Sequence, residues 1–187
     1  MMDLLSQLST STTKGMAFNI SFFEFYFRTP QSAFQQFVGA EKWKTRRFGK
    51  EVAVKKVDRD HSNLNYWQVK VDGSYTYSEE ETIQKTILTS TAIIILIPGM
   101  AAPIQGYVWN YFLGNERLNP RIPLLLVAEN PEGLGADECR EKVTQQLDLE
   151  AAWLREYEII CLSKDRKSWE VFVSRLVEKV LAFTTTT

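Results

Sequence analysis

The stretch Ile20–Phe27 (ISFFEFYF), followed at once by Arg28-Thr29-Pro30, decides the fold class. Apolar residues occupy both alternations of this run, which is typical of a β-strand that is covered on both faces of a sheet. Thr29 can cap a helix and Pro30 suits a first helical position, so a helix is expected to follow directly. A doubly covered strand that leads into a helix indicates an α/β architecture.

The rest of the chain alternates between apolar runs and segments with helical spacing. Further strands are expected around Val52–Lys56, Trp67–Val71, Ala92–Ile97, Leu124–Ala128 and Glu158–Leu162. Further helices are expected over Glu79–Leu88 and Ile104–Phe112, after a cap at Asp137 as far as Leu147, and after a cap at Ser168 or Asp165. The polar segment Asp58–Asn63 is expected to turn between two strands and to make an antiparallel hairpin.

These elements predict one α/β domain over residues 17–183. We expect a three-layer sandwich, in which helices cover both faces of a mostly parallel, six-stranded sheet that contains one antiparallel hairpin. Residues 1–16, which are rich in Ser and Thr, are expected to be a flexible leader, and residues 184–187 a disordered tail.

Composition bounds the function. A chain of 187 residues that is 44% hydrophobic can bury a substantial core. Its net charge of −1 gives no overall bias toward nucleic acid or membrane. The apolar run Ala92–Ile97 is far shorter than the roughly 20 residues that span a bilayer. Cys139 and Cys161 do not suggest a disulfide framework, so two buried, unreactive thiols and an intracellular location, cytoplasmic or nuclear, are expected.

Charge is distributed unevenly along the chain. Between Lys42 and Arg59 there are eight basic residues and two acidic ones, whereas Glu129 to Glu158 holds nine acidic and three basic residues. Solvated faces of helices and of the hairpin account for such runs. The stretch Lys42–Arg47, expected at a helix end, could also bind an acidic partner or, with Trp43, nucleic acid.

The stretch Pro123–Ala136 (PLLLVAENPEGLGA) resembles the base-recognition segment of Arf-like small GTPases, in which an apolar strand precedes the motif N-K-x-D. Laid on without gaps, this motif falls on Glu129-Asn130-Pro131-Glu132, where Glu132 keeps a carboxylate. Tyr66–Val69 resembles the strand before the family's D-x-x-G, and Leu162-Ser163-Lys164 stands where the family has S-A-K. The resemblance implies a small-GTPase-like fold over most of the chain.

The residues that handle phosphate and metal in this family are replaced here. The first loop, Phe27–Ser32 (FRTPQS), has no glycine and no lysine before Ser32, although a phosphate cradle needs close backbone approach and a positive charge. The metal-side Asp of D-x-x-G falls on Gln68. We therefore expect a pseudo-GTPase with no enzyme activity, cofactor or metal. Any nucleotide would be contacted by Thr29, Ser32, Glu132 and Lys164.

Other catalytic sites are not apparent in the sequence. His61 is the single histidine and lies in a polar turn, so neither a metal site nor a conventional triad can be assembled around it. No catalytic residue is predicted.

The favoured function is that of an interaction module or subunit in a larger protein assembly, its oligomeric state open. The candidate partner-binding residues are Trp43, Lys44, Arg46, Arg47 and Trp109. One alternative is a nucleotide-binding or hydrolytic α/β enzyme of another family, with Glu129, Asn130 and Lys164 at the carboxyl ends of the strands. Another is a nucleic-acid-associated adaptor that uses the basic segment 42–59.

Overall fold

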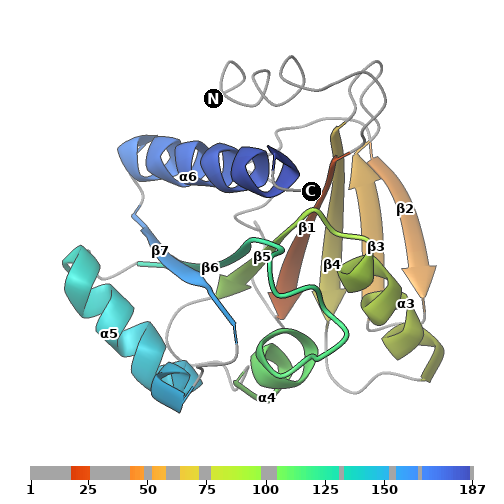
Figure 1. The fold of residues 1–187 in the computed structure, drawn as a ribbon, viewed down its shortest axis with the longest axis horizontal. Helices are drawn as coiled ribbons and strands as arrows, with labels where there is room; N and C mark the ends of the chain where they lie inside the picture. The colour runs from red at the N-terminus through yellow and green to blue at the C-terminus, as the bar shows by residue number, and fades with distance from the viewer. Residues whose placement is uncertain are drawn as a thin grey trace.

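The computed structural model describes residues 18–25, 43–48, 52–57, 64–71, 77–97, 105–130, 133–151, 155–163 and 166–185. A seven-stranded sheet in the order β2-β3-β4-β1-β5-β6-β7 forms its centre (Figure 1). The strands are β1 (Phe18–Phe25), β2 (Trp43–Phe48), β3 (Val52–Val57), β4 (Leu64–Val71), β5 (Ala92–Ile97), β6 (Leu124–Glu129) and β7 (Glu158–Leu162).

In the order in which the strands lie side by side, β4-β1-β5-β6-β7 are parallel, and β3 and β2 add two antiparallel pairings beyond β4. β1 lies in the middle and pairs in parallel with β4 and β5, and β6 pairs in parallel with β5 and β7. β3 is antiparallel to both β2 and β4. The antiparallel pairing of β3 with β4 agrees with the prediction, but the predicted number of six strands is wrong, because the described residues form seven strands with two antiparallel pairings.

The additional strand is β2, which falls on the basic stretch that the sequence places at a helix end. It pairs with β3 along its whole length, from Trp43 opposite Val57 to Phe48 opposite Val52. Backbone hydrogen bonds to β3 therefore decide the conformation of this stretch. A strand depends on its neighbouring strand more than on the intrinsic preference of its residues, so the charged sequence alone does not predict it.

Helices cover both faces of the sheet (Figure 1). They are α3 (Tyr77–Leu88), α4 (Gln105–Val108) with its π-helical continuation η1 (Trp109–Leu113), α5 (Ala136–Leu147), the short 3-10 helix η2 (Leu149–Ala151) and α6 (Arg166–Thr185). In Figure 1, α6 lies on one side of the sheet and α3, α4 and α5 lie on the other. The helix expected after Thr29 lies outside the described residues.

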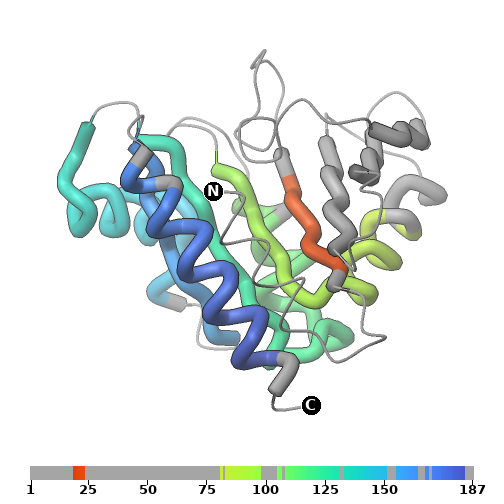
Figure 2. Tube along the Cα trace, turned by 90° about the horizontal axis from the view of Figure 1, so that it is seen from above, coloured from red at the N-terminus to blue at the C-terminus, as the bar shows by residue number. Residues whose placement is uncertain are grey.

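Each face of the sheet carries a core. Phe23 belongs to the core that includes α3, η1 and α5, and its ring meets Phe112 edge to face with centroids 4.9 Å apart. Ile20 and Phe22 point into the other core, under α6. Figure 2 shows α6 lying over the half of the sheet that contains β6 and β7. The prediction that the first strand is covered on both faces is confirmed for these residues.

The sequence pattern of the last helix is also confirmed. Its apolar residues at helical spacing are buried, namely Phe172, Val173, Leu176, Val177 and Val180. The helix extends to Thr185, so it includes Thr184 and Thr185, which the sequence places in a disordered tail. The predicted leader lies outside the described residues. Within the described part of the chain, no helix is both long and apolar enough to cross a membrane.

Candidate functional site

The carboxyl-terminal edge of the parallel strands is where α/β folds of this kind bind ligands. β6 ends at Glu129 and β7 ends at Leu162, and these two residues stand opposite each other in the register. The backbone N–H of Asn130 donates to the carbonyl oxygen of Leu162 at 2.8 Å, so the exits of the two strands are joined directly. This edge holds the segment that resembles a base-recognition motif.

Asn130 closes the loop that follows β6. It is 8% exposed, its Oδ1 accepts from the backbone N–H of Leu134 at 3.0 Å, and its Nδ2 donates to the carbonyl oxygen of Leu134 at 2.8 Å. Gly133 has a φ of 69°, a left-handed conformation that favours glycine, and its N–H donates to the Asn130 carbonyl oxygen. Both polar atoms of the Asn130 side chain are therefore hydrogen-bonded to the backbone of Leu134.

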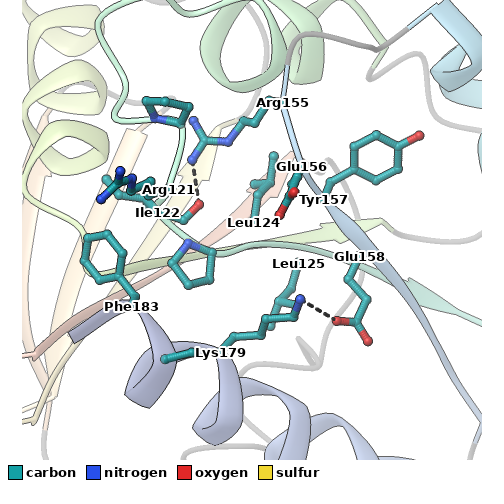
Figure 3. Close-up of a pocket in the computed structure, with 13 residues that line it drawn as sticks. Arg121, Ile122, Leu124, Leu125, Arg155, Glu156, Tyr157, Glu158, Lys179 and Phe183 are labelled. Atoms are coloured by element: carbon teal, nitrogen blue, oxygen red, sulfur yellow. Dashed lines mark hydrogen bonds and ion pairs between the residues drawn. The ribbon is translucent and has the colours of Figure 1, made fainter. Parts of the chain in front are cut away.

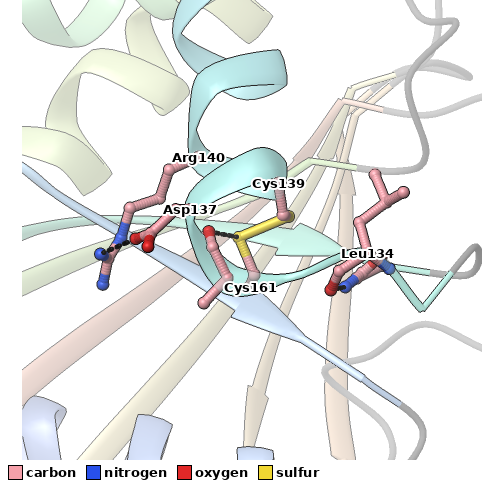
Figure 4. Close-up of a disulfide and its surroundings, with 7 residues drawn as sticks. Leu134, Asp137, Cys139, Arg140 and Cys161 are labelled. Atoms are coloured by element: carbon pink, nitrogen blue, oxygen red, sulfur yellow. Dashed lines mark hydrogen bonds and ion pairs between the residues drawn. A yellow bond between two sulfur atoms is a disulfide. The ribbon is translucent and has the colours of Figure 1, made fainter.

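A disulfide links the start of α5 to β7 at this same edge (Figure 4). It joins Cys139 and Cys161, whose Cα atoms are 6.4 Å apart. The prediction of two unreactive thiols is wrong, because the two cysteines are paired with each other. The physical reason is that β6–β7 pairing and the packing of α5 bring these cysteines together, whereas their spacing in the sequence does not report their distance.

The first turn of α5 also differs from its prediction. Asp137 is expected to cap this helix, but the N-cap residue is Gly135, and Asp137 lies inside the first turn beside Arg140. The Gly135 carbonyl oxygen accepts from the Cys139 N–H at 2.9 Å, which starts the helix two residues earlier than expected. An acidic residue in the first turn still suits the helix dipole.

The structure gives no positions for the four residues predicted to contact a nucleotide. Thr29, Ser32, Glu132 and Lys164 all lie outside the described residues, as does His61. Gln68 stands on β4, opposite Phe22 of β1 in the register. Among the described residues, no group of three or more His, Cys, Asp or Glu side chains could hold a metal ion.

The predicted partner-binding residues fall in two places. Trp43, Lys44, Arg46 and Arg47 lie on β2, at the end of the strand order. Trp109 lies on η1, is partly buried against the core, and donates from Nε1 to the carbonyl oxygen of Leu147 at 2.7 Å. Leu147 ends α5, where carbonyl groups lack partners within the helix, so this hydrogen bond and the packing against the core fix the position of the Trp109 side chain.

A hollow lies at the opposite edge of the sheet, and the sequence contains no signal for it. It has a volume of about 620 Å³ and is lined by the starts of β6 and β7 and by the end of α6 (Figure 3). The buried Arg155 lies in its wall, and desolvation by burial lowers the pKa of this guanidinium to about 10. Arg155 stands among acidic and apolar residues, a context that resembles an ordinary surface segment.

Comparisons with known proteins address the fold. No family model and no curated protein matches this chain. An ADP-ribosylation-factor-like GTP-binding protein from Encephalitozoon cuniculi, a small COPII coat GTPase SAR1 solved with GDP, matches with a TM-score of 0.60 at 10% identity, covering 99% of this chain and 86% of that chain. The Arl6 BBS3 small GTPase from Trypanosoma brucei, solved with bound GppNp, matches with a TM-score of 0.53 at 9% identity, covering 88% and 99% respectively.

The chain has the fold of a small GTPase. The resemblance seen in Pro123–Ala136 is thus confirmed at the level of fold. At these identities the small-GTPase fold carries no information about nucleotide binding or hydrolysis, because one fold supports many functions.

Proposed function

We propose that this small-GTPase-like domain does not catalyse GTP hydrolysis and serves as a protein interaction module within a larger assembly. The observation that carries the proposal is the closure of the loop after β6 by Asn130. The amide of Asn130 is buried and hydrogen-bonded to the backbone of Leu134. A loop that satisfies its own polar groups in this way is stable without a base to bind.

The sequence of the phosphate side supports the same proposal. Phe27–Ser32 offers no glycine for close backbone approach and no lysine before Ser32. Phosphoryl transfer depends almost entirely on positioning and on positive charge around the transferred group. With Gln68 at the metal-side position as well, the chain lacks the side chains from which such catalysis is built.

The surface proposed for docking is the edge formed by β2. In the described sheet β2 is the outermost strand, so its outer backbone groups can accept an extended segment from a partner. Strands β2 and β3 together carry five basic residues, Lys44, Arg46, Arg47, Lys55 and Lys56. We infer that the preferred partner is an extended, acidic protein segment.

The register of the two strands strengthens this inference. Lys44 stands directly opposite Lys56 in the antiparallel pair. Like charges at directly opposed positions are unfavourable in a sheet. A partner that supplies carboxylates would complement the charge of the basic residues on these two strands.

The first experiment tests nucleotide binding. The purified protein is titrated by calorimetry with GTP, GDP, ATP and ADP, with and without Mg²⁺, and is denatured to release any co-purified nucleotide. We expect no binding up to millimolar concentration and no released nucleotide. Micromolar or tighter binding of a guanine nucleotide would overturn the proposal of a domain without nucleotide chemistry.

The second experiment tests the docking edge. Proteins captured by the wild type are compared with those captured by K44Q/R46Q/R47Q and by a control with three exposed basic residues neutralised elsewhere, R117Q/R140Q/K167Q. We expect the β2 variant alone to lose its partner. If instead the captured molecule is nucleic acid, which nuclease treatment and a steep salt dependence reveal, the adaptor alternative replaces this proposal.

A further inference from the structure

The cavity at the amino-terminal edge of β6 and β7 is a second candidate binding site. Its volume of about 620 Å³ falls in the range of small-molecule pockets, about 300–1,000 Å³. Leu124 and Leu125 begin β6, Glu158 begins β7, and Phe183 lies near the end of α6; all four line the cavity (Figure 3). This is the edge opposite the one where ligands usually bind in this fold class, so the site is separate from the loop of Asn130.

Arg155 gives the cavity a positive charge that no acidic side chain of the described residues pairs with. The residue is 7% exposed, and its Nη2 donates to the carbonyl oxygens of Asn119 at 3.0 Å and Ile122 at 2.6 Å. Its Nε is buried and has no hydrogen-bond partner in the described part of the chain. A buried charge is normally paired with an opposite charge. Two neutral carbonyls orient this guanidinium without neutralising it.

The acidic residue at the start of β7 does not supply the missing charge. Glu158 is paired with cations of α6, with Oε1 at 3.5 Å from Arg175 Nε and Oε2 at 3.6 Å from Lys179 Nζ (Figure 3). Arg121, which is exposed, adds a further cation to the lining. The remaining acid of the lining, Glu156, is exposed to solvent.

The rest of the lining is largely apolar. It includes Ile122, Leu124, Leu125, Tyr157, Ala182 and Phe183. A hollow whose wall is part apolar and part polar, with guanidinium groups in it, fits one kind of molecule, since guanidinium pairs well with carboxylate and phosphate and the apolar part favours a hydrocarbon body.

We propose that this cavity binds a small amphipathic anion, with its carboxylate or phosphate group held by Arg155 and Arg121 and its apolar body lying against Leu124 and Phe183. The site is independent of the proposed docking edge on β2. A carboxylate and a phosphate monoester share the chemistry that the site recognises, and the test separates them.

The test measures binding of decanoate, decyl phosphate and decanol by calorimetry, each below the concentration at which it aggregates. We expect at least one anion to bind roughly tenfold or more tightly than decanol, the difference expected for a charge-assisted hydrogen bond. R121Q should lower the affinity for that anion by roughly tenfold. A182F should lower the affinity for all three compounds, because the larger side chain fills the hollow. The control R140Q, on an exposed helix face, should leave the affinity unchanged.

Arg155 is tested with R155M, which keeps the bulk of the side chain and removes the charge. We expect a folded R155M to lose preference for the anion over decanol. Should R155M fail to fold, R121Q and A182F still decide, because both residues are exposed in the structure. Equal affinity for anion and alcohol, affinities unchanged in R121Q and A182F, or no binding up to millimolar anion would each overturn the proposal.

Discussion

Asn130 and Leu134 are joined by two hydrogen bonds in which the side-chain amide of Asn130 both accepts from and donates to the backbone of Leu134. The same Asn130 donates its backbone N–H to Leu162 at the end of β7. One buried residue thus connects the exit of β6, the exit of β7 and the segment that leads into α5. These contacts hold Asn130 and Leu134 in place beside the ends of the two strands.

Replacing Asn130 by alanine should lower the free energy of unfolding by about 1–3 kcal/mol, because the buried backbone groups of Leu134 lose their partners. Urea unfolding followed by circular dichroism measures the change. The matched control is N110A, an exposed asparagine on η1, which should change stability by less than about 0.5 kcal/mol. Equal effects of the two substitutions would show that the Asn130 contacts contribute nothing.

Reduction of the disulfide between Cys139 and Cys161 should lower stability by about 3 kcal/mol, the effect expected for a cross-link between residues 22 apart. Stability is measured by urea unfolding with and without a phosphine reductant. Because the chain has two cysteines, thiol titration of the denatured, unreduced protein should detect no free thiol. Two titrating thiols in that sample would contradict the disulfide.

Trp109→Phe should lower the free energy of unfolding by about 1 kcal/mol, because it removes the Nε1 hydrogen bond to Leu147 and keeps the aromatic packing. Trp109→Ala should cost clearly more, since it also removes the packing against the core. Urea unfolding of both variants separates the two contributions. Partner capture should be unaffected by Trp109→Phe. If the variant no longer captures the partner, Trp109 takes part in docking.

The buried Arg155 predicts a dependence of stability on alkaline pH. Desolvation lowers the pKa of its guanidinium in the folded protein to about 10, below the value of the unfolded chain. Above about pH 10 the unfolded chain therefore holds more protons than the folded one, and stability rises with pH. The stability of the wild type relative to R155M should rise by about 1 kcal/mol from pH 9 to pH 11. A flat or falling difference would show that burial does not perturb this group.

Several elements follow from sequence pattern alone. The strand bounds Ala92–Ile97 and Glu158–Leu162 agree with the sequence because each is a short apolar run between polar residues or turn formers. The buried face of α6 agrees because apolar residues recur at helical spacing from Phe172 to Val180, which leaves little ambiguity. β2 could not be found this way, since its strand state depends on pairing with β3.

The candidate site was predictable in place but not in detail. Pro123–Ala136 marks the edge of the sheet correctly, because an apolar strand and its turn residues are local features. The contacts of Asn130 with Leu134 and Leu162, and the hydrogen bonds of Arg155, depend on side-chain packing that no local pattern reports.

The sequence by itself determined the alternation of strands and helices, the two-sided burial of the first strand and the absence of a glycine-rich phosphate loop at Phe27–Ser32, because each of these is written in neighbouring residues. The tertiary structure decided the seventh strand, the pairing of Cys139 with Cys161 and the cavity beside Arg155. The disulfide and the cavity bring together segments distant in the sequence, and β2 becomes a strand through its pairing with the neighbouring β3. Their separation in space is set by how helices pack on the sheet, which a one-dimensional pattern does not contain.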